Sequence, residues 1–401
     1  MSECEVKKEK LVLIRLPNWL GDCIMLTPTL ELLKRIEGVQ VVLVGNKISL
    51  APFSRDSFIK DLVIDSTKED SKKSTFKLLA RVKNVARLAK DLKAKYNFEY
   101  ALTFQNAFFS ALLLRLSGAK IRIGYSGFRS FLLTHPINKA LGKPPVCKHQ
   151  ILSYATLLIP LVSKLNLVSK TLHLPNYFNS NLSPAQKLLF ENIGPMKLKA
   201  RSIKQIKTKK NLVLGISPGA AFGPSKMWLI EYFAEVASYF LNKDYEVRIY
   251  GAPSEEELGE RLKSLVAKST TKLELFNNLI GKTDIKTLID SINECNVHIG
   301  NDSGNSQIAT ALNVPAISFY GPMGEKWAYP WSVKENGVDS GIEEGDHTFL
   351  GNSVAITKDL PCLGCKKRVC PLKHHNCMRL ITPDEVIDLV TYLVNHSLQK
   401  V

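Results

Sequence analysis

Short apolar runs alternate with segments of helical spacing along most of the chain. The apolar runs are residues 11–16, 39–44, 212–216, 297–299 and 316–320. Segments with helical spacing follow several of them, at residues 23–35, 229–241 and 306–312. Continuous apolar runs are typical of strands buried on both faces, and a helix between two such strands makes them parallel. The pattern therefore predicts an α/β protein.

The stretch from Ile299 to Gly321 carries this pattern most clearly. It predicts a strand, a polar loop at residues 301–304, a helix and a second strand. A loop at the carboxyl end of a parallel strand is where open α/β sheets bind ligands, and the following helix N-terminus favours a phosphate. An ordinary turn with Asp302 or Ser303 as the N-cap explains the same residues equally well.

The chain has 401 residues, which is too long for one ordinary core, so two domains are expected. The strand and helix pattern begins again after a loop-like segment near residue 175. We therefore predict an N-terminal domain at residues 1–175, a second domain at 176–382 and a C-terminal helix at 383–401.

The formal net charge of +17 favours an anionic partner, which leaves nucleic acid, a membrane surface or a phosphorylated substrate. Much of the charge is scattered lysine, and a solvated basic surface explains part of it. Residues 1–10 lack a signal-peptide core, and no apolar run is long enough to span a bilayer. A cytoplasmic location with reduced thiols is expected.

Three further positions invite chemistry. The loop at residues 217–228 combines glycines with Lys226, and such a loop can hold a phosphate, although no Walker pattern is present. Glu255 follows a predicted strand, where it is either a ribose ligand or a residue favoured by the helix dipole. Asp22 is either a general base or the N-cap of the next helix.

The densest cluster of potential ligands lies near the C-terminus. Cys362, Cys365, Cys370 and Cys377 fall within 16 residues, with two histidines between them. Four thiols in a reduced compartment suggest a structural zinc site. Their spacing is not that of a standard zinc ribbon, so reduced, partly buried thiols are an equal alternative.

Four motifs in this order resemble glycosyltransferase family 9, in particular the lipopolysaccharide heptosyltransferase II type. They are Pro17-Asn-Trp-Leu-Gly-Asp22, Pro218-Gly-Ala-Ala-Phe-Gly-Pro-Ser-Lys-Met-Trp228, Asn301-Asp-Ser-Gly304 and the cysteine segment at residues 361–378. The resemblance implies a GT-B fold, in which two Rossmann-like domains face a central cleft and the C-terminal helix returns to the first domain. It also implies inverting transfer of L-glycero-D-manno-heptose from ADP-heptose to the inner core of lipopolysaccharide.

The resemblance assigns roles to individual residues. Asp22 becomes the catalytic base and Lys226 the phosphate ligand, while Glu255 binds the ribose or adenine side. The remaining donor-binding residues are Ser217, Gly219, Ala220, Asp302, Ser303 and Gly304. No cofactor is required.

The implied acceptor is Kdo-lipid A or a heptosylated inner core, presented at the cytoplasmic face of the inner membrane. Arg122 and Arg129 are our candidates for binding its anionic groups, because arginine makes paired contacts to carboxylate and phosphate. The +17 charge then also suits an anionic membrane surface.

One position departs from the family pattern. Members usually carry a histidine three residues after Gly304, whereas this chain has Gln307. Another nucleotide sugar or acceptor, or a catalytically weak glycan-binding protein, therefore stays open. A nucleic-acid binder ranks last, because the chain has no aromatic–basic motif for one.

Overall fold

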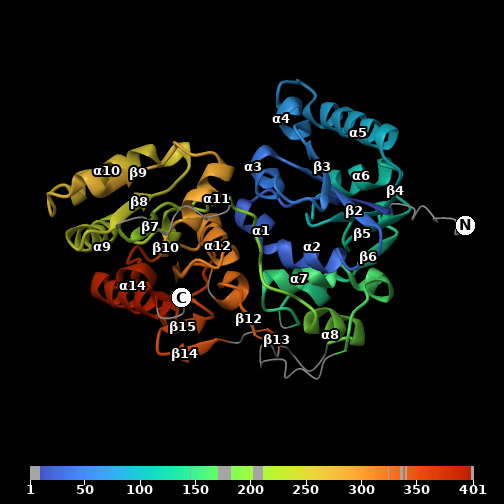
Figure 1. Cartoon of the computed structure of the whole chain (residues 1–401). Helices are drawn as coiled ribbons and strands as arrows, with labels where there is room; N and C mark the ends of the chain where they lie inside the picture. The colour runs from blue at the N-terminus through green and yellow to red at the C-terminus, as the bar shows by residue number, and fades with distance from the viewer. Residues whose placement is uncertain are drawn as a thin grey trace, which may run out of the picture. The chain divides into compact units, whose positions relative to one another are not determined.

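The computed structural model describes residues 10–144, 146–169, 182–201, 211–323, 325–334, 337–338 and 341–398. Two compact units divide the chain. Unit 1 comprises residues 1–194 and 335–338, and unit 2 comprises residues 195–334 and 339–401. Each unit contains one sheet with helices packed on it (Figure 1). The predicted α/β class is confirmed.

Unit 1 is built on a six-stranded parallel sheet in the order β3-β2-β1-β4-β5-β6. The strands are β1 (Lys10–Arg15), β2 (Val39–Gly45), β3 (Ile59–Ile64), β4 (Phe98–Thr103), β5 (Ile121–Tyr125) and β6 (His135–Ile137). The helices are α1 (Leu20–Met25), α2 (Thr27–Leu33), α3 (Lys47–Leu50), α4 (Thr67–Lys72), α5 (Lys77–Lys95), α6 (Phe108–Leu116), α7 (Gln150–Thr156) and α8 (Pro184–Glu191). Short 3₁₀ helices are η1 (Ala51–Phe53), η2 (Ser130–Leu132), η3 (Lys139–Gly142) and η4 (Ile159–Lys164).

The central strands of this sheet are covered on both faces. Side chains of α5 and α6 pack with Leu11, Leu13, Val42 and Val44 in one core, while Val12 and Ile14 of β1 are buried on the opposite side. In Figure 1, α2 and α7 lie on that opposite side of the strands. Double coverage explains why these strands read as continuous apolar runs.

Unit 2 contains an eight-stranded sheet in the order β14-β15-β16-β11-β10-β7-β8-β9, in which only the pairs β14–β15 and β15–β16 are antiparallel. The strands are β7 (Val213–Ser217), β8 (Glu246–Ile249), β9 (Phe276–Asn278), β10 (Val297–Asn301), β11 (Ala316–Tyr320), β14 (Ile342–Glu344), β15 (His347–Leu350) and β16 (Ser353–Thr357). The chain also forms the two-residue strands β12 (Val333–Lys334) and β13 (Gly337–Val338).

The helices of unit 2 are α9 (Ile230–Asn242), α10 (Glu256–Val266), α11 (Ile285–Asn293), α12 (Gly304–Ala311), α13 (Asn376–Arg379) and α14 (Pro383–Leu398). Its 3₁₀ helices are η6 (Pro224–Lys226), η7 (Pro253–Glu255), η8 (Leu273–Leu275) and η9 (Glu325–Ala328). Trp228 lies at the centre of the core, stacked at an angle on Phe319 and bonded through its indole N–H to the Ile381 carbonyl at 3.0 Å.

Two features differ from the predicted domain arrangement. The unit boundary lies after Gly194, so α8 belongs to unit 1 rather than to the second domain. The C-terminal helix α14 joins the core of unit 2, where Val386, Val390 and Val394 are buried. Its apolar stripe packs on α9, β10 and β11, so in the structure this helix completes unit 2.

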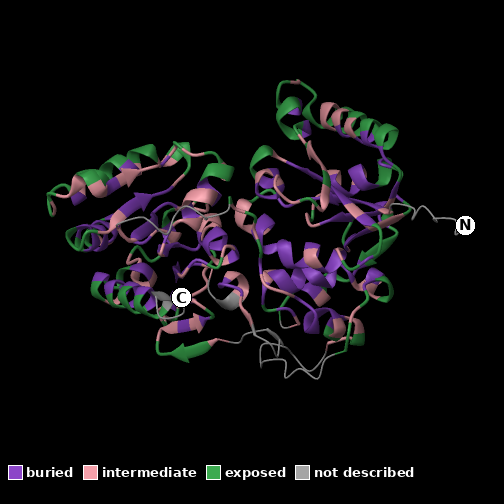
Figure 2. Ribbon diagram, in the orientation of Figure 1, coloured by how far each residue is buried: buried purple, intermediate pink, exposed green. Residues whose placement is uncertain are grey.

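Burial follows the layers in both units. The strands are largely buried, and the exposed residues lie on the outer faces of helices and in loops (Figure 2). Among the helices of the described ranges, none combines the length and apolar character needed to cross a membrane.

Candidate active site

The predicted base lies at the carboxyl end of the sheet in unit 1. Asp22 is the third residue of the short helix α1, and its side chain is half-buried. The buried Tyr154 of α7 shares a side-chain hydrogen bond with Asp22, and burial together with this carboxylate raises the pKa of Tyr154. The phenol therefore stays protonated at neutral pH and donates to the Asp22 carboxylate.

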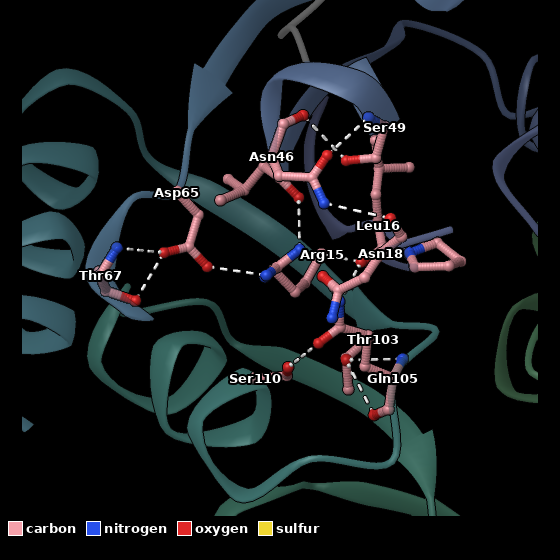
Figure 3. A network of polar contacts seen from close by, with 12 residues as sticks. Arg15, Leu16, Asn18, Asn46, Ser49, Asp65, Thr67, Thr103, Gln105 and Ser110 are labelled. Atoms are coloured by element: carbon pink, nitrogen blue, oxygen red, sulfur yellow. Dashed lines mark hydrogen bonds and ion pairs between the residues drawn. The ribbon is translucent and has the colours of Figure 1, made fainter. Parts of the chain in front are cut away.

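Amide side chains fix the loop that leads into α1 (Figure 3). Gln105 Nε2 donates to the Leu16 carbonyl at 2.7 Å and to Asn18 Oδ1 at 2.8 Å. Asn46 Nδ2 donates to the Asn18 carbonyl at 3.1 Å, and the Ser110 hydroxyl donates to Gln105 Oε1 at 2.7 Å. Since Asn46 follows β2 and Gln105 follows β4, the two neighbouring strand ends hold the loop after β1.

The cation at this edge is already neutralised. Arg15 NH2 lies 2.8 Å from Asp65 Oδ2, and both side chains are nearly buried. Arg15 also donates to the Leu16 and Val44 carbonyls, at 2.9 and 3.3 Å. Burial is the largest influence on Arg15 and lowers its pKa, against the opposing effect of Asp65. Arg15 therefore stabilises the loop through these contacts and is not available to a substrate.

The two predicted acceptor ligands make hydrogen bonds within unit 1, and Arg122 and Arg129 stay predictions as acceptor ligands. Arg129 is only 2% exposed, and burial lowers its pKa. Its guanidinium donates to the carbonyls of Gln105, Ala107 and Tyr125 and to Asn106 Oδ1. Arg122 donates to the Leu132 and Ala119 carbonyls at 3.0 and 2.8 Å. Both arginines complete backbone hydrogen bonding in the loops after β4 and β5.

In unit 2 the predicted donor residues converge at three neighbouring strand ends. Lys226 Nζ bonds to the Asp302 carboxylate and lies 3.3 Å from the Asp302 carbonyl. Both side chains are nearly buried, with exposed fractions of 12% and 9%. The Lys226 ammonium also lies over the Phe222 ring. The pair brings the loop after β7 and the loop after β10 together, and it holds a cation beside the N-terminus of α12.

Asn301, the last residue of β10, locks these two loops. Its Oδ1 accepts the Trp228 backbone N–H at 2.8 Å, and its Nδ2 donates to the carbonyls of Pro218 and Gly219 at 2.8 and 3.3 Å. The side chain is fully buried. A single residue therefore sets the start and the end of the glycine-containing loop that carries Lys226.

Ser217, at the end of β7, takes part in a second buried contact between the strands. Its hydroxyl lies 2.9 Å from His298 Nε2 and accepts from Asn305 Nδ2 at 3.0 Å. Burial lowers the pKa of His298 to about 3, so this ring is neutral at physiological pH. The Ser217 hydroxyl is thus held by protein groups on both sides.

The N-terminus of α12 is suited to an anion. The first N–H groups of a helix have no carbonyl partner within the helix, and here they follow Ser303 and begin at Gly304. The Ser303 hydroxyl is buried and has no hydrogen-bond partner among the described residues. An orphaned donor, free helix N–H groups and the Lys226 ammonium together form the donor set that a phosphate requires.

Glu255 meets the same loop from η7. Its Oε2 accepts the Ala252 N–H at 2.8 Å, and burial raises its pKa. A Cβ atom at Gly219 would lie 2.0 Å from Glu255 Oε1, so glycine is required for this close approach. Ala220 accepts the Gly223 N–H in the turn that follows. The carboxylate therefore caps its own helix and also lines the glycine loop.

Residues 85–354 match glycosyltransferase family 9 (heptosyltransferase). The chain belongs to glycosyltransferase family 9. It is 30% identical over 385 residues to lipooligosaccharide heptosyltransferase 2 of Campylobacter jejuni, covering 95% of this chain and 98% of that relative.

Solved family 9 structures share the fold. Escherichia coli ADP-heptose lps heptosyltransferase II superposes with a TM-score of 0.71 at 19% identity, covering 96% of this chain and 99% of that one. The E. coli heptosyltransferase WaaC with ADP-2-deoxy-2-fluoro heptose gives 0.61 at 16% identity, covering 95% and 99%. The expected GT-B fold, with its two Rossmann-like units, is confirmed.

The departure at Gln307 has a structural explanation in this family 9 chain. Gln307 Nε2 donates to the Ala328 carbonyl at 2.7 Å, and the side chain is buried. Tyr320 donates to the same carbonyl at 2.8 Å. The Gln307 Oε1 atom is buried without a partner among the described residues. The glutamine thus anchors the segment after β11 and leaves one acceptor for a further group.

The predicted zinc site does not fit the cysteine segment. All four cysteines are free thiols that line one small cavity together with His374 and His375. Cys362 Sγ lies 3.9 Å from His374 Nε2, and no three side chains of the described residues come close enough to hold a metal ion. Burial, helped by the neighbouring thiols, raises the pKa of Cys377 to about 11. The Cys377 thiol is therefore protonated at neutral pH.

The same segment supports the Lys226 loop. Ser225 donates its hydroxyl to the Lys367 carbonyl at 2.6 Å and its N–H to the Arg368 carbonyl at 3.1 Å. Arg368 in turn donates to the Phe222 carbonyl at 2.8 Å. The cysteine segment therefore packs against the loop that carries Lys226, the candidate phosphate ligand, and stabilises it by hydrogen bonds.

Sequence reasoning missed the residues that position the candidate site residues within each unit. They are Asn301, His298, Gln105, Asn46 and Tyr154. Most are polar residues at or just after the end of a buried strand, which was the available signal. Their partners lie far away in the chain, so the spacing of the motifs does not reveal the pairing.

Proposed function

We propose that this protein transfers L-glycero-D-manno-heptose from ADP-heptose to the inner core of lipopolysaccharide, with inversion at the anomeric carbon. The observation that carries the proposal is the Lys226–Asp302 pair at the N-terminus of α12, in a chain of the heptosyltransferase family. The solved structure of WaaC with ADP-2-deoxy-2-fluoro heptose, a protein of the same fold, supports the choice of donor.

In this proposal the diphosphate of the donor binds Lys226, the first N–H groups of α12 and the Ser303 hydroxyl. Charge develops on ADP as the glycosidic bond breaks. A fixed ammonium and oriented N–H groups in a nearly dry site stabilise that charge with little reorganisation. The ribose hydroxyls donate to Glu255, whose raised pKa reflects a carboxylate with little solvent around it. Gly219 lets the nucleotide approach the backbone.

Asp22 removes the proton from the attacking acceptor hydroxyl. The hydrogen bond from Tyr154 orients the carboxylate, and the amide network around Asn18 fixes the loop beneath it. Inversion is a single displacement, so one base suffices and no covalent intermediate is needed. No step requires a metal ion or cofactor.

The test is product formation by the full-length protein. With ADP-heptose and a Kdo-lipid A acceptor, or one already carrying heptose, the acceptor should gain the mass of one heptose. UDP-sugars should give no product. Gln307, which stands where the resembling family usually carries a histidine, leaves one alternative, a different nucleotide sugar. Transfer from another ADP- or UDP-sugar, with none from ADP-heptose, would establish that alternative and refute the proposal.

A further inference from the structure

Helix α5 of unit 1 has a strongly cationic outer surface. Its 19 residues contain seven lysines and arginines and one acidic residue, Asp91. Lys83, Arg87 and Lys90 are all exposed, and no ion pair within the described ranges involves them. By contrast, Lys95 at the end of the helix pairs with Asp61 at 2.7 Å. The middle of the helix therefore presents uncompensated positive charge.

The apolar stripe of α5 extends beyond the core that it covers. Val85, Ala89 and Leu92 are buried against the sheet. Leu78 and Val82 continue the same stripe toward the N-terminus, yet they are 72% and 37% exposed. Phe76 beside them is 74% exposed. A stripe that ends in solvent indicates a second surface for it to contact.

A cluster of phenylalanines adjoins this end of the helix. Arg81 places its guanidinium 4.0 Å from the ring centre of Phe109, and Phe109 packs edge-on against Phe108. Phe108 contacts two residues of the segment after β5, namely Phe128 and Phe131, with ring centres 6.0 and 6.5 Å away. Phe128 and Phe131 are 77% and 72% exposed. Arg81 thus links the uncovered stripe to the phenylalanine cluster.

We propose that this surface docks on a bilayer containing anionic phospholipid. The docking surface consists of Phe76, Leu78, Val82, Phe128 and Phe131, with Lys83, Arg87 and Lys90 on the outward, polar face of the same helix. An exposed apolar stripe with lysine and arginine on the polar face is the composition of an interfacial helix, in which the apolar groups enter the acyl boundary and the long cationic side chains reach lipid phosphates. A protein partner would have to be strongly acidic to match the same cations. Of the proposed function, this inference uses only the membrane-borne acceptor.

Sedimentation with lipid vesicles tests the proposal without any substrate. The full-length protein should bind vesicles of phosphatidylcholine mixed with phosphatidylglycerol and bind phosphatidylcholine alone weakly. Added salt should weaken the binding, because exposed charges are screened. Failure of heptose transfer would leave this measurement unaffected, so the two proposals fail separately.

Two variants and two controls locate the contact. Phe128→Ser/Phe131→Ser and Lys83→Glu/Arg87→Glu/Lys90→Glu should each weaken binding by about tenfold or more. The matched controls Ile342→Ser and Lys263→Glu/Lys268→Glu change exposed residues of unit 2 and should bind like the parent protein. Thermal unfolding should show that all four variants are folded. Binding that is unchanged in both docking-surface variants, or lost equally in the controls, would overturn the proposal, and so would a parent protein that binds neither vesicle.

Discussion

The loop after β1 in unit 1 and the loops after β7 and β10 in unit 2 lie at the same edge of their sheets, yet they are held by different chemistry. In unit 1, neutral amides of Asn46 and Gln105 hold the loop, and the local cation Arg15 is paired beneath it. In unit 2, an ion pair joins two loops beside a helix N-terminus.

The difference matches what each edge presents. Unit 1 presents a carboxylate, Asp22, that shares a hydrogen bond with the Tyr154 phenol. Unit 2 presents the first N–H groups of α12, which favour an anion, beside the Lys226–Asp302 ion pair. In the proposed function, unit 1 therefore supplies the base and unit 2 supplies the anion site.

Asp22→Asn should show the largest effect. The amide keeps the size and the hydrogen bond from Tyr154 but cannot accept a proton, so transfer from ADP-heptose should fall by about 10²- to 10⁴-fold. Initial rates at saturating substrate measure this fall. The matched variant Asp61→Asn changes another carboxylate of unit 1, paired with Lys95 far along the chain, and should keep the parent rate. Near-parent transfer in Asp22→Asn would remove this residue as the base.

Lys226→Met should raise the Kd of ADP by about 10- to 100-fold, because a charge-assisted contact to phosphate is lost. It also leaves the nearly buried Asp302 without its partner, which lowers stability. The double variant Lys226→Met/Asp302→Asn removes both charges and should recover stability without recovering affinity. If calorimetry finds parent-like ADP affinity in either variant, Lys226 is not a phosphate ligand.

Asn301→Ala and Gln105→Ala compare the two ways of holding a loop. Asn301→Ala leaves the buried Trp228 N–H and the Pro218 carbonyl unpaired, so the free energy of unfolding should drop by about 2–3 kcal/mol and the KM for donor should rise. Gln105→Ala should lower the free energy of unfolding by about 1–2 kcal/mol. It should also lower kcat, with little change in the KM for donor. Chemical denaturation and steady-state kinetics measure both. If both variants change the same kinetic constant, the proposed difference between the two loops is wrong.

His298 predicts a smaller, pH-dependent effect in unit 2. Its pKa is about 3 in the folded protein, below the ordinary 6.5, so the unfolded chain binds the extra proton between these values. Stability is therefore full above about pH 6.5 and falls as the pH is lowered toward 3, by about 2 kcal/mol at pH 5. His298→Gln should lose less stability than the parent between pH 7 and 5. Identical acid sensitivity in the two proteins would contradict this.

The apolar runs were sufficient to predict the parallel strands, because a strand that is covered on both faces must be apolar at nearly every position. They also placed Lys226, Asp302, Gly219 and Glu255 at strand ends, and the structure brings these residues together. The directions of the side chains were not predictable from the sequence. Arg129 donates to backbone carbonyls that come together only when the loops fold. The direction of each thiol depends on how residues 362–377 pack against Ser225.

The most direct test of this division between the two edges is the Kd of ADP for Asp22→Asn, measured by calorimetry on the preparation used for the rate assay. If unit 1 supplies the base and unit 2 binds the nucleotide, the Kd should stay within about twofold of the parent value while transfer is lost. A loss of ADP affinity in parallel with activity would show that Asp22 acts in nucleotide binding, and the proposed roles of the two edges would be wrong.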